Sequence, residues 1–93
     1  MILFLLGCLS YEDGQVQRGE LNCELLDVCG ELDGLGFDSV DACAESAASQ
    51  NYDEDACANY SASQMKACIQ AYEDAVVSED CEADLVDVCQ VCG

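Results

Sequence analysis

The sequence has no histidine and no proline, and Arg18 and Lys66 are its only basic residues. Without histidine, the chain lacks the usual general base of enzymes and the middle member of a serine triad. Two basic side chains do not make the positive surface that phosphate binding requires, so we do not expect nucleic acid as a partner. We therefore expect a non-enzymatic protein with no catalytic residue and no cofactor.

Acidic residues dominate the charge of the chain, because 20 aspartates and glutamates give a net charge of −18 at pH 7. This acidity opposes adsorption to anionic lipid head groups. It is also typical of disordered chains, but 52% of the residues are hydrophobic, which favours a packed fold. We interpret the carboxylates as a solubilising surface, with divalent-cation binding as the alternative.

No segment fits the calcium loop of an EF-hand, so we expect no metal site. The nearest candidate is "ELDGLGFDSVDA", residues 31–42, which contains acids and glycines. Its acids do not fall at the required positions, and Ala42 stands where the loop needs a glutamate that binds with both oxygens.

The longest uninterrupted apolar run is Ile-Leu-Phe-Leu-Leu at residues 2–6, followed by Gly7 and Cys8. A transmembrane helix needs roughly 20 apolar residues, so this run is too short to span a bilayer. It is also shorter than the apolar part of a complete signal peptide, and no basic residue precedes it. The run predicts the end of an export signal, and a start codon upstream of Met1 would supply the missing basic residues.

Leu5-Leu6-Gly7-Cys8 resembles the lipobox of bacterial lipoproteins. The resemblance implies cleavage before Cys8, a diacylglycerol anchor on its sulfur, and location at the bacterial outer membrane or cell surface. With "DACAES", "KACIQAYEDA" and "VDVCQVCG", the whole chain is similar to short, acidic, cysteine-rich bacterial lipoproteins, whose functions are mostly unassigned. The alternatives are a truncated ordinary signal peptide, which implies secretion, and a retained apolar N-terminus that packs in the fold or in an assembly.

Nine cysteines in 93 residues approach the density of a disulfide-stapled scaffold. A lipid on Cys8 would leave an even set of eight for four disulfides: Cys23, Cys29, Cys43, Cys57, Cys68, Cys81, Cys89 and Cys92. Without a lipid, Cys8 is a candidate for a disulfide between subunits. Roughly a hundred connectivities are open. The helical spacing of Cys23 and Cys29 predicts only that these two have different partners.

The chain contains one CxxC motif, Cys89-Gln90-Val91-Cys92, whose spacing also occurs in redox and zinc sites. A thioredoxin-type site needs a βαβ setting and a following helix, which this chain does not predict. A structural zinc site needs clustered cysteine pairs or cysteines with histidine. We therefore interpret both cysteines as structural.

The chain divides into three predicted parts: an export-signal remnant over residues 1–8, a flexible tether over 9–19, and a disulfide-rich domain over 20–93. The tether segment is polar, contains two glycines and shows no periodicity, and as a coil it would reach on the order of 20 Å. Apolar residues in the domain recur with helical spacing, and no segment alternates for long enough to indicate a strand. The predicted fold is an all-α, disulfide-stapled bundle of about four short helices.

Capping residues and apolar stripes predict where these helices lie. The first runs from about residue 20 to residue 32, where the glycines of "DGLG" stop it. Asp38 is the predicted N-cap of the second, and Ser61 with Gln64 predicts a capping box at the start of the third. A fourth is predicted to begin in "SED" at residues 78–80 and to end near Cys92. Every stripe contains a cysteine, so interhelical disulfides are expected.

A second resemblance, over part of the chain, is to saposin-like proteins. Cys57 and Cys68 enclose ten residues, as the middle cysteine pair of that family does, and "DVCQVC" is similar to its paired terminal cysteines. The resemblance implies lipid binding.

The features together predict an exported, lipid-anchored acidic domain that presents an interaction or protective surface at the cell envelope. One alternative is a structural subunit that self-associates through its apolar N-terminus or Cys8. The other is a carrier of a small ligand, a lipid or calcium.

Overall fold

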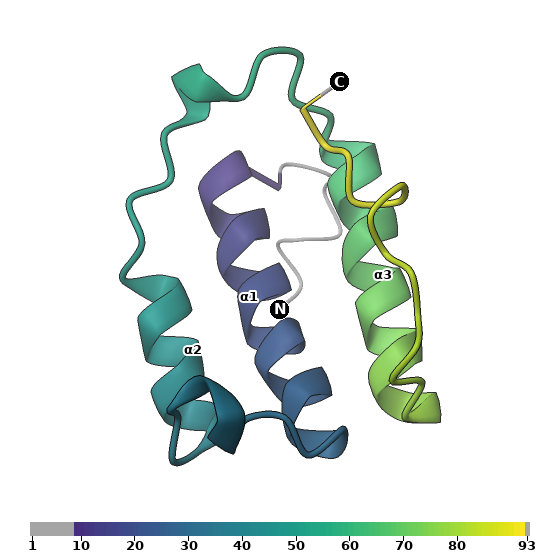
Figure 1. The fold of residues 1–93 in the computed structure, drawn as a ribbon. Helices are drawn as coiled ribbons and strands as arrows, with labels where there is room; N and C mark the ends of the chain where they lie inside the picture. The colour runs from purple at the N-terminus through teal and green to yellow at the C-terminus, as the bar shows by residue number, and fades with distance from the viewer. Residues whose placement is uncertain (1–8, 93) are drawn as a thin grey trace.

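The fold is that of a computed structural model, which describes residues 9–92. Along the chain it contains α1 (Tyr11–Val28), the 3-10 turn η2 (Asp33–Leu35), α2 (Val40–Ala48), the 3-10 turn η3 (Glu54–Ala56) and α3 (Ala62–Ser78). Helix α1 lies in the middle and packs against both α2 and α3 (Figure 1). The C-terminal segment, residues 79–92, runs back beside α3 (Figure 1). The predicted all-α class is confirmed, with three α-helices and no strand in the described range.

Helix α1 begins at Tyr11 rather than near Glu20, so the prediction of a flexible tether over residues 9–19 is wrong. The hydroxyl of Ser10 caps the helix by accepting a hydrogen bond from the Asp13 N–H at 3.1 Å. Glu12 and Asp13 lie in the first turn, where negative charge is favourable to the helix dipole. The first half of α1 therefore belongs to the folded domain.

The two glycines of this segment allow close helix packing. A Cβ at Gly14 would lie 2.5 Å from Cγ of Met65 on α3, and one at Gly19 would lie 2.7 Å from Cβ of Ala47 on α2. Both distances are well below ordinary carbon–carbon contact. The segment lacks a hydrophobic stripe because backbone, rather than side chains, makes these contacts.

Helix α1 ends in a Schellman motif around Gly30, whose φ of +71° is in the left-handed region. The Glu31 N–H donates to the Leu26 carbonyl at 2.9 Å, and the Gly30 N–H donates to the Asp27 carbonyl at 3.1 Å. The predicted end near Leu32 was therefore slightly late, since the helix stops before the "DGLG" turn.

Helix α3 ends in the same motif with Glu79 at φ +54° in place of a glycine. The Asp80 N–H donates to the Ala75 carbonyl at 2.9 Å. A left-handed conformation costs an L-residue roughly 1–2 kcal/mol, so this helix end carries backbone strain.

The predicted fourth helix is absent, since residues 80–92 form short turns joined by irregular segments. The carboxylate of Asp80 accepts a hydrogen bond from the Glu82 N–H, and that of Asp84 accepts one from the Val86 N–H, both at 3.2 Å. Such local side-chain bonds offer the backbone an alternative to a helix. The apolar stripe of this segment is instead used by a loop that lies on α3.

The other two helix starts lie close to their predictions. Helix α2 is capped by Ser39 rather than Asp38, since the Ser39 hydroxyl accepts from the Ala42 N–H at 3.1 Å. Ser61 caps α3 as predicted and accepts from the Gln64 N–H at 3.1 Å.

The reciprocal half of the capping box at α3 is not formed. The side chain of Gln64 donates to the Val88 carbonyl at 2.6 Å, and the Ser61 N–H donates to the Val91 carbonyl at 2.9 Å. Both donors at the start of α3 are therefore used to hold the C-terminal segment.

Two hydrophobic clusters form the core. The first lies among α1, α3 and the C-terminal segment, and its buried members are Leu9, Cys57, Met65, Cys68 and Val91. The second lies between α1 and α2, and its buried members are Cys23, Leu32 and Cys43. Each cluster contains two cysteines, so disulfides take the place of larger apolar side chains in this small core.

Candidate functional site

All eight cysteines predicted to form disulfides do so. The pairs are Cys23–Cys43, Cys29–Cys81, Cys57–Cys92 and Cys68–Cys89, with Cα–Cα distances of 5.8, 5.7, 5.0 and 4.7 Å. The first pair joins α1 to α2, and the other three attach the C-terminal segment to the end of α1, to the link before α3 and to α3 itself. Cys23 and Cys29 have different partners, as predicted.

The connectivity also decides how the CxxC motif is used. Cys89 and Cys92 bond to different partners, so they do not form a redox pair with each other. Cys57 and Cys68 are likewise not bonded to each other, although their spacing carried the resemblance to saposin-like proteins. These four cysteines hold the C-terminal segment against α3.

The N-terminal end of the described chain is firmly attached to the domain. Cys8, the predicted lipidation site, lies outside the described residues, but Leu9 is buried with 5% of its surface exposed. The hydroxyl of Tyr60 donates to the Leu9 carbonyl at 2.9 Å. Burial raises the pKa of Tyr60, and the nearby carboxylates of Glu54 and Asp13 raise it further. The hydroxyl therefore stays a protonated donor at neutral pH.

Aromatic rings surround this attachment. The ring of Tyr11 makes edge-to-face contacts with Tyr52 and Tyr60, at centroid distances of 6.4 and 5.6 Å. The amide nitrogen of Gln15 donates to the Tyr11 hydroxyl at 3.1 Å, and its amide oxygen is buried without a partner. Residues from α1 and from the link before α3 thus surround the peptide that follows Cys8.

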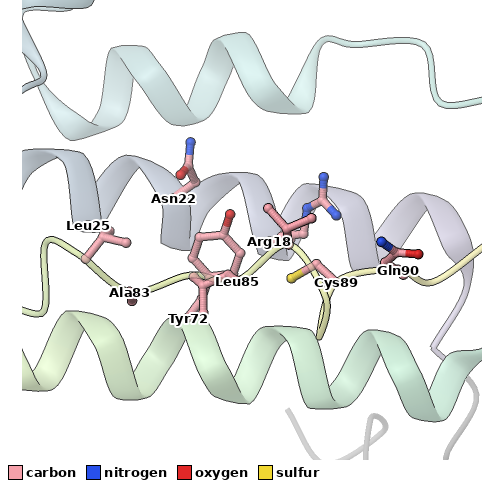
Figure 2. Close-up of a pocket in the computed structure, with 9 residues that line it drawn as sticks. Arg18, Asn22, Leu25, Tyr72, Ala83, Leu85, Cys89 and Gln90 are labelled. Carbon is pink, nitrogen blue, oxygen red and sulfur yellow. The ribbon is translucent and has the colours of Figure 1, made fainter.

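A groove of about 510 Å³ lies between α1 and the C-terminal segment and reaches Tyr72 on α3. Its lining residues are Arg18, Asn22, Leu25, Tyr72, Ala83, Leu85, Val86, Cys89 and Gln90. Figure 2 shows the Tyr72 ring reaching from α3 towards α1, between Asn22 and Arg18. The polar side chains on its walls are a guanidinium and two amides beside the Tyr72 phenol, and none of the lining residues is acidic.

A second cleft has the opposite character. It has a volume of about 260 Å³, lies between α1 and α2, and is lined by Glu20, Asp41 and Glu45 with two alanines. Across residues 9–92, no group of three or more acidic or cysteine side chains is placed to hold a metal ion. The buried residues of this range include no charged side chain, so its carboxylates lie at the surface.

No helix within the described range is long and apolar enough to cross a membrane.

The chain matches no family model, no curated protein and no solved structure. The attachment at Leu9, the disulfides and the groove are the features of the structure that bear on function.

Sequence reasoning identified the disulfide cysteines but missed the groove and the docking of Leu9. One signal for the groove was present, because Arg18 is one of two cations in a strongly acidic chain. The signal for the docking was weaker: Leu9 is the one large apolar residue between Cys8 and Tyr11.

Proposed function

We propose that this protein is an exported bacterial lipoprotein, anchored by diacylglycerol on Cys8, whose acidic helical domain acts without catalysis. One observation carries the proposal: eight of the nine cysteines form four disulfides within the domain, and the ninth is the cysteine of Leu5-Leu6-Gly7-Cys8. Disulfides persist in oxidising compartments outside the cytosol, where a lipoprotein would reside. The lipid accounts for the odd cysteine.

The docking of Leu9 determines how close a lipid on Cys8 would lie to the folded domain. Because Leu9 is buried and its carbonyl is bonded to Tyr60, a lipid on Cys8 is separated from the folded domain by a single peptide bond. The domain then lies against the membrane with the start of α1 and the link before α3 facing the lipid. Two acyl chains are sufficient for stable anchoring.

The acidic surface determines which kinds of partner the domain can bind. With a net charge of −18, the domain repels anionic lipid and nucleic acid. It favours a partner with a basic surface, and the same charge keeps copies of the domain apart. Covalent anchoring is therefore needed to hold such a protein at an envelope, where it acts as an interaction or protective surface.

Detergent phase partition of the full chain, expressed in bacteria from its own gene with the upstream DNA, tests the proposal. We expect the wild type, grown with labelled palmitate, to enter the detergent phase carrying the label, and Cys8→Ser to carry no label in either phase. Cys8 is not among the eight paired cysteines, so both proteins keep four disulfides and the same helical circular dichroism.

Absence of the palmitate label from the wild type would rule out a lipid anchor on Cys8. A covalent ladder of the wild type on a non-reducing gel, absent from Cys8→Ser, would instead favour the structural subunit that self-associates through Cys8.

A further inference from the structure

The groove beside Arg18 differs in charge from the rest of the molecule. The chain has 20 acidic residues among 93, yet none of the nine residues that line this groove is acidic. One of the two cations of the chain is among those nine. The other, Lys66, is exposed on α3 and does not line the groove. The walls of the groove thus carry one positive charge and no carboxylate, although Glu82, Asp84 and Asp87 are next to lining residues in the sequence.

The groove is also amphipathic. Leu25, Leu85 and Tyr72 are half-buried on its walls, and Val86 is 67% exposed at its edge. Its volume of about 510 Å³ is within the range of small-molecule pockets. Cys89 is bonded to Cys68, so no reactive thiol lies there. The groove therefore offers apolar walls beside a single cationic group.

We propose that this groove binds a single-chain amphiphile with a carboxylate head, of the class of medium-chain fatty acids. The guanidinium of Arg18 pairs with the carboxylate, because its planar donors match the two oxygens. The amides of Asn22 and Gln90 line the same groove and supply further donors. The hydrocarbon chain lies against Leu85 and the Tyr72 ring.

Charge distinguishes this ligand from others of the same shape. A cationic amphiphile would be attracted to the acidic surface everywhere. An anionic one is favoured only beside a cation, and of Arg18 and Lys66 only Arg18 lines this groove. Carboxylates outside the groove, including those of Glu82, Asp84 and Asp87 beside lining residues in the sequence, oppose its approach. Salt weakens this repulsion, because at physiological salt the Debye length is about 8 Å. The inference does not depend on the proposed lipid anchor, because no groove residue contributes to the attachment of Leu9.

Isothermal titration calorimetry with decanoate, below its micelle-forming concentration and at physiological salt, tests the proposal on the full chain. We expect saturable binding at one site, and no saturable binding of acetate, which has the head group alone. Arg18→Gln should weaken decanoate binding about tenfold or more, as loss of a charge-assisted hydrogen bond would. Lys66→Gln removes the same charge outside the groove and should leave binding unchanged.

A second pair of variants tests the apolar wall. Val86→Asp places a carboxylate at the edge of the groove and should abolish decanoate binding. Val77→Asp places the same group on α3, at a residue that is 85% exposed and outside the groove. It should have no effect. Both residues are exposed, so neither variant should alter the fold, and circular dichroism checks this.

Backbone amide shifts in nuclear magnetic resonance spectra locate the site. Decanoate should shift the amides of residues 18–25 and 83–90 and leave those of α2 unchanged. The proposal is overturned by absence of saturable binding, by equal weakening in Arg18→Gln and Lys66→Gln, or by shifts that map elsewhere. Each of these results leaves the partition experiment on Cys8 unaffected, so the two proposals fail separately.

Discussion

At the scale of single residues, Tyr60 has the largest consequence for the proposed anchor. Its hydroxyl is the donor that holds the Leu9 carbonyl, and its ring contacts Tyr11 at the start of α1. Removing the hydroxyl leaves the ring packing in place and leaves the carbonyl without this donor. A Tyr60→Phe substitution therefore isolates the contribution of this one hydrogen bond to stability from that of the surrounding core.

We expect Tyr60→Phe to lower the free energy of unfolding by about 1 kcal/mol, the net value of such a hydrogen bond. Chemical denaturation followed by circular dichroism measures it. Tyr72→Phe is the matched control, since no hydrogen bond of the Tyr72 hydroxyl is present among the described residues. An equal loss of unfolding free energy in both variants would show that the Tyr60 hydroxyl does not make this hydrogen bond.

The pH dependence of stability gives a second test of Tyr60. Because burial and nearby carboxylates raise its pKa above the ordinary 10.0, the unfolded chain releases this proton first. The folded state then binds more protons, so stability that is present below pH 10 is lost as the pH rises through the folded pKa. Wild type should lose stability more steeply above pH 10 than Tyr60→Phe, as alkaline denaturation series would show. Parallel curves would contradict the role of Tyr60.

Gly14 tests the close packing of α1 against α3. A methyl group there would meet Met65, whose side chain is fully buried. Overpacking costs about 1–3 kcal/mol, while alanine gains up to about 1 kcal/mol in helix propensity. We therefore expect Gly14→Ala to be destabilising by a net of about 1 kcal/mol in denaturant titrations. Gly34→Ala, where a Cβ meets nothing within 4 Å, should change stability little. A stabilised Gly14→Ala would show that the helices are not in close contact.

At the scale of elements, the two long helices end in the same motif with different residues. Helix α1 has Gly30 at the left-handed position, where glycine is unstrained, and α3 has Glu79 there. The unstrained end of α1 is therefore a reference for the backbone strain at the end of α3.

Glu79→Gly should raise the free energy of unfolding by about 0.5–1 kcal/mol. Relief of left-handed strain exceeds the extra entropy that glycine has in the unfolded chain. The reciprocal change, Gly30→Ala, should be destabilising by a similar amount, and thermal unfolding measures both. If Glu79→Gly is destabilising, then α3 does not end in this conformation.

The elements also show what could be predicted from sequence. Helix α3 was predicted well because Ser61 supplies a local cap and its apolar stripe is long. The first half of α1 was missed because Gly14 and Gly19 make packing contacts that carry no hydrophobic signal. The predicted fourth helix failed because Asp80 and Asp84 bond to nearby backbone, which local periodicity does not reveal.

The same reasoning applies to the candidate sites. The eight disulfide cysteines were predictable, because nine cysteines in a chain of 93 residues are typical of a disulfide-stapled scaffold. Their pairing was not, since it depends on which segments meet in space. The groove was also out of reach, because it combines the middle of α1, one side of α3 and a loop that had been predicted as a helix.

At the scale of the whole molecule, we expect the four disulfides to contribute much of the stability. Three of the four bridges attach residues 79–92, a segment without a helix of its own. In the chain-entropy model, closing loops of these lengths stabilises a fold by about 3–4 kcal/mol per bridge. The core of this domain is small, so the fold is expected to depend on them.

We therefore expect reduction of the four disulfides to abolish most of the helical circular dichroism at room temperature. The self-repulsion of a chain with a net charge of −18 adds to the loss. A sample kept oxidised in the same denaturant-free buffer is the control. Retention of the helical signal after complete reduction, verified by thiol titration, would show that packing alone maintains the fold.

Eight cysteines staple the domain, and we propose that Cys8 anchors it to lipid. Intact-mass spectrometry of the protein purified from bacterial membranes tests this most directly. We expect a chain that begins at Cys8, carries a diacylglycerol group there, and has four disulfides among its other cysteines. A mass that retains residues 1–7, or a free thiol at Cys8, would contradict it.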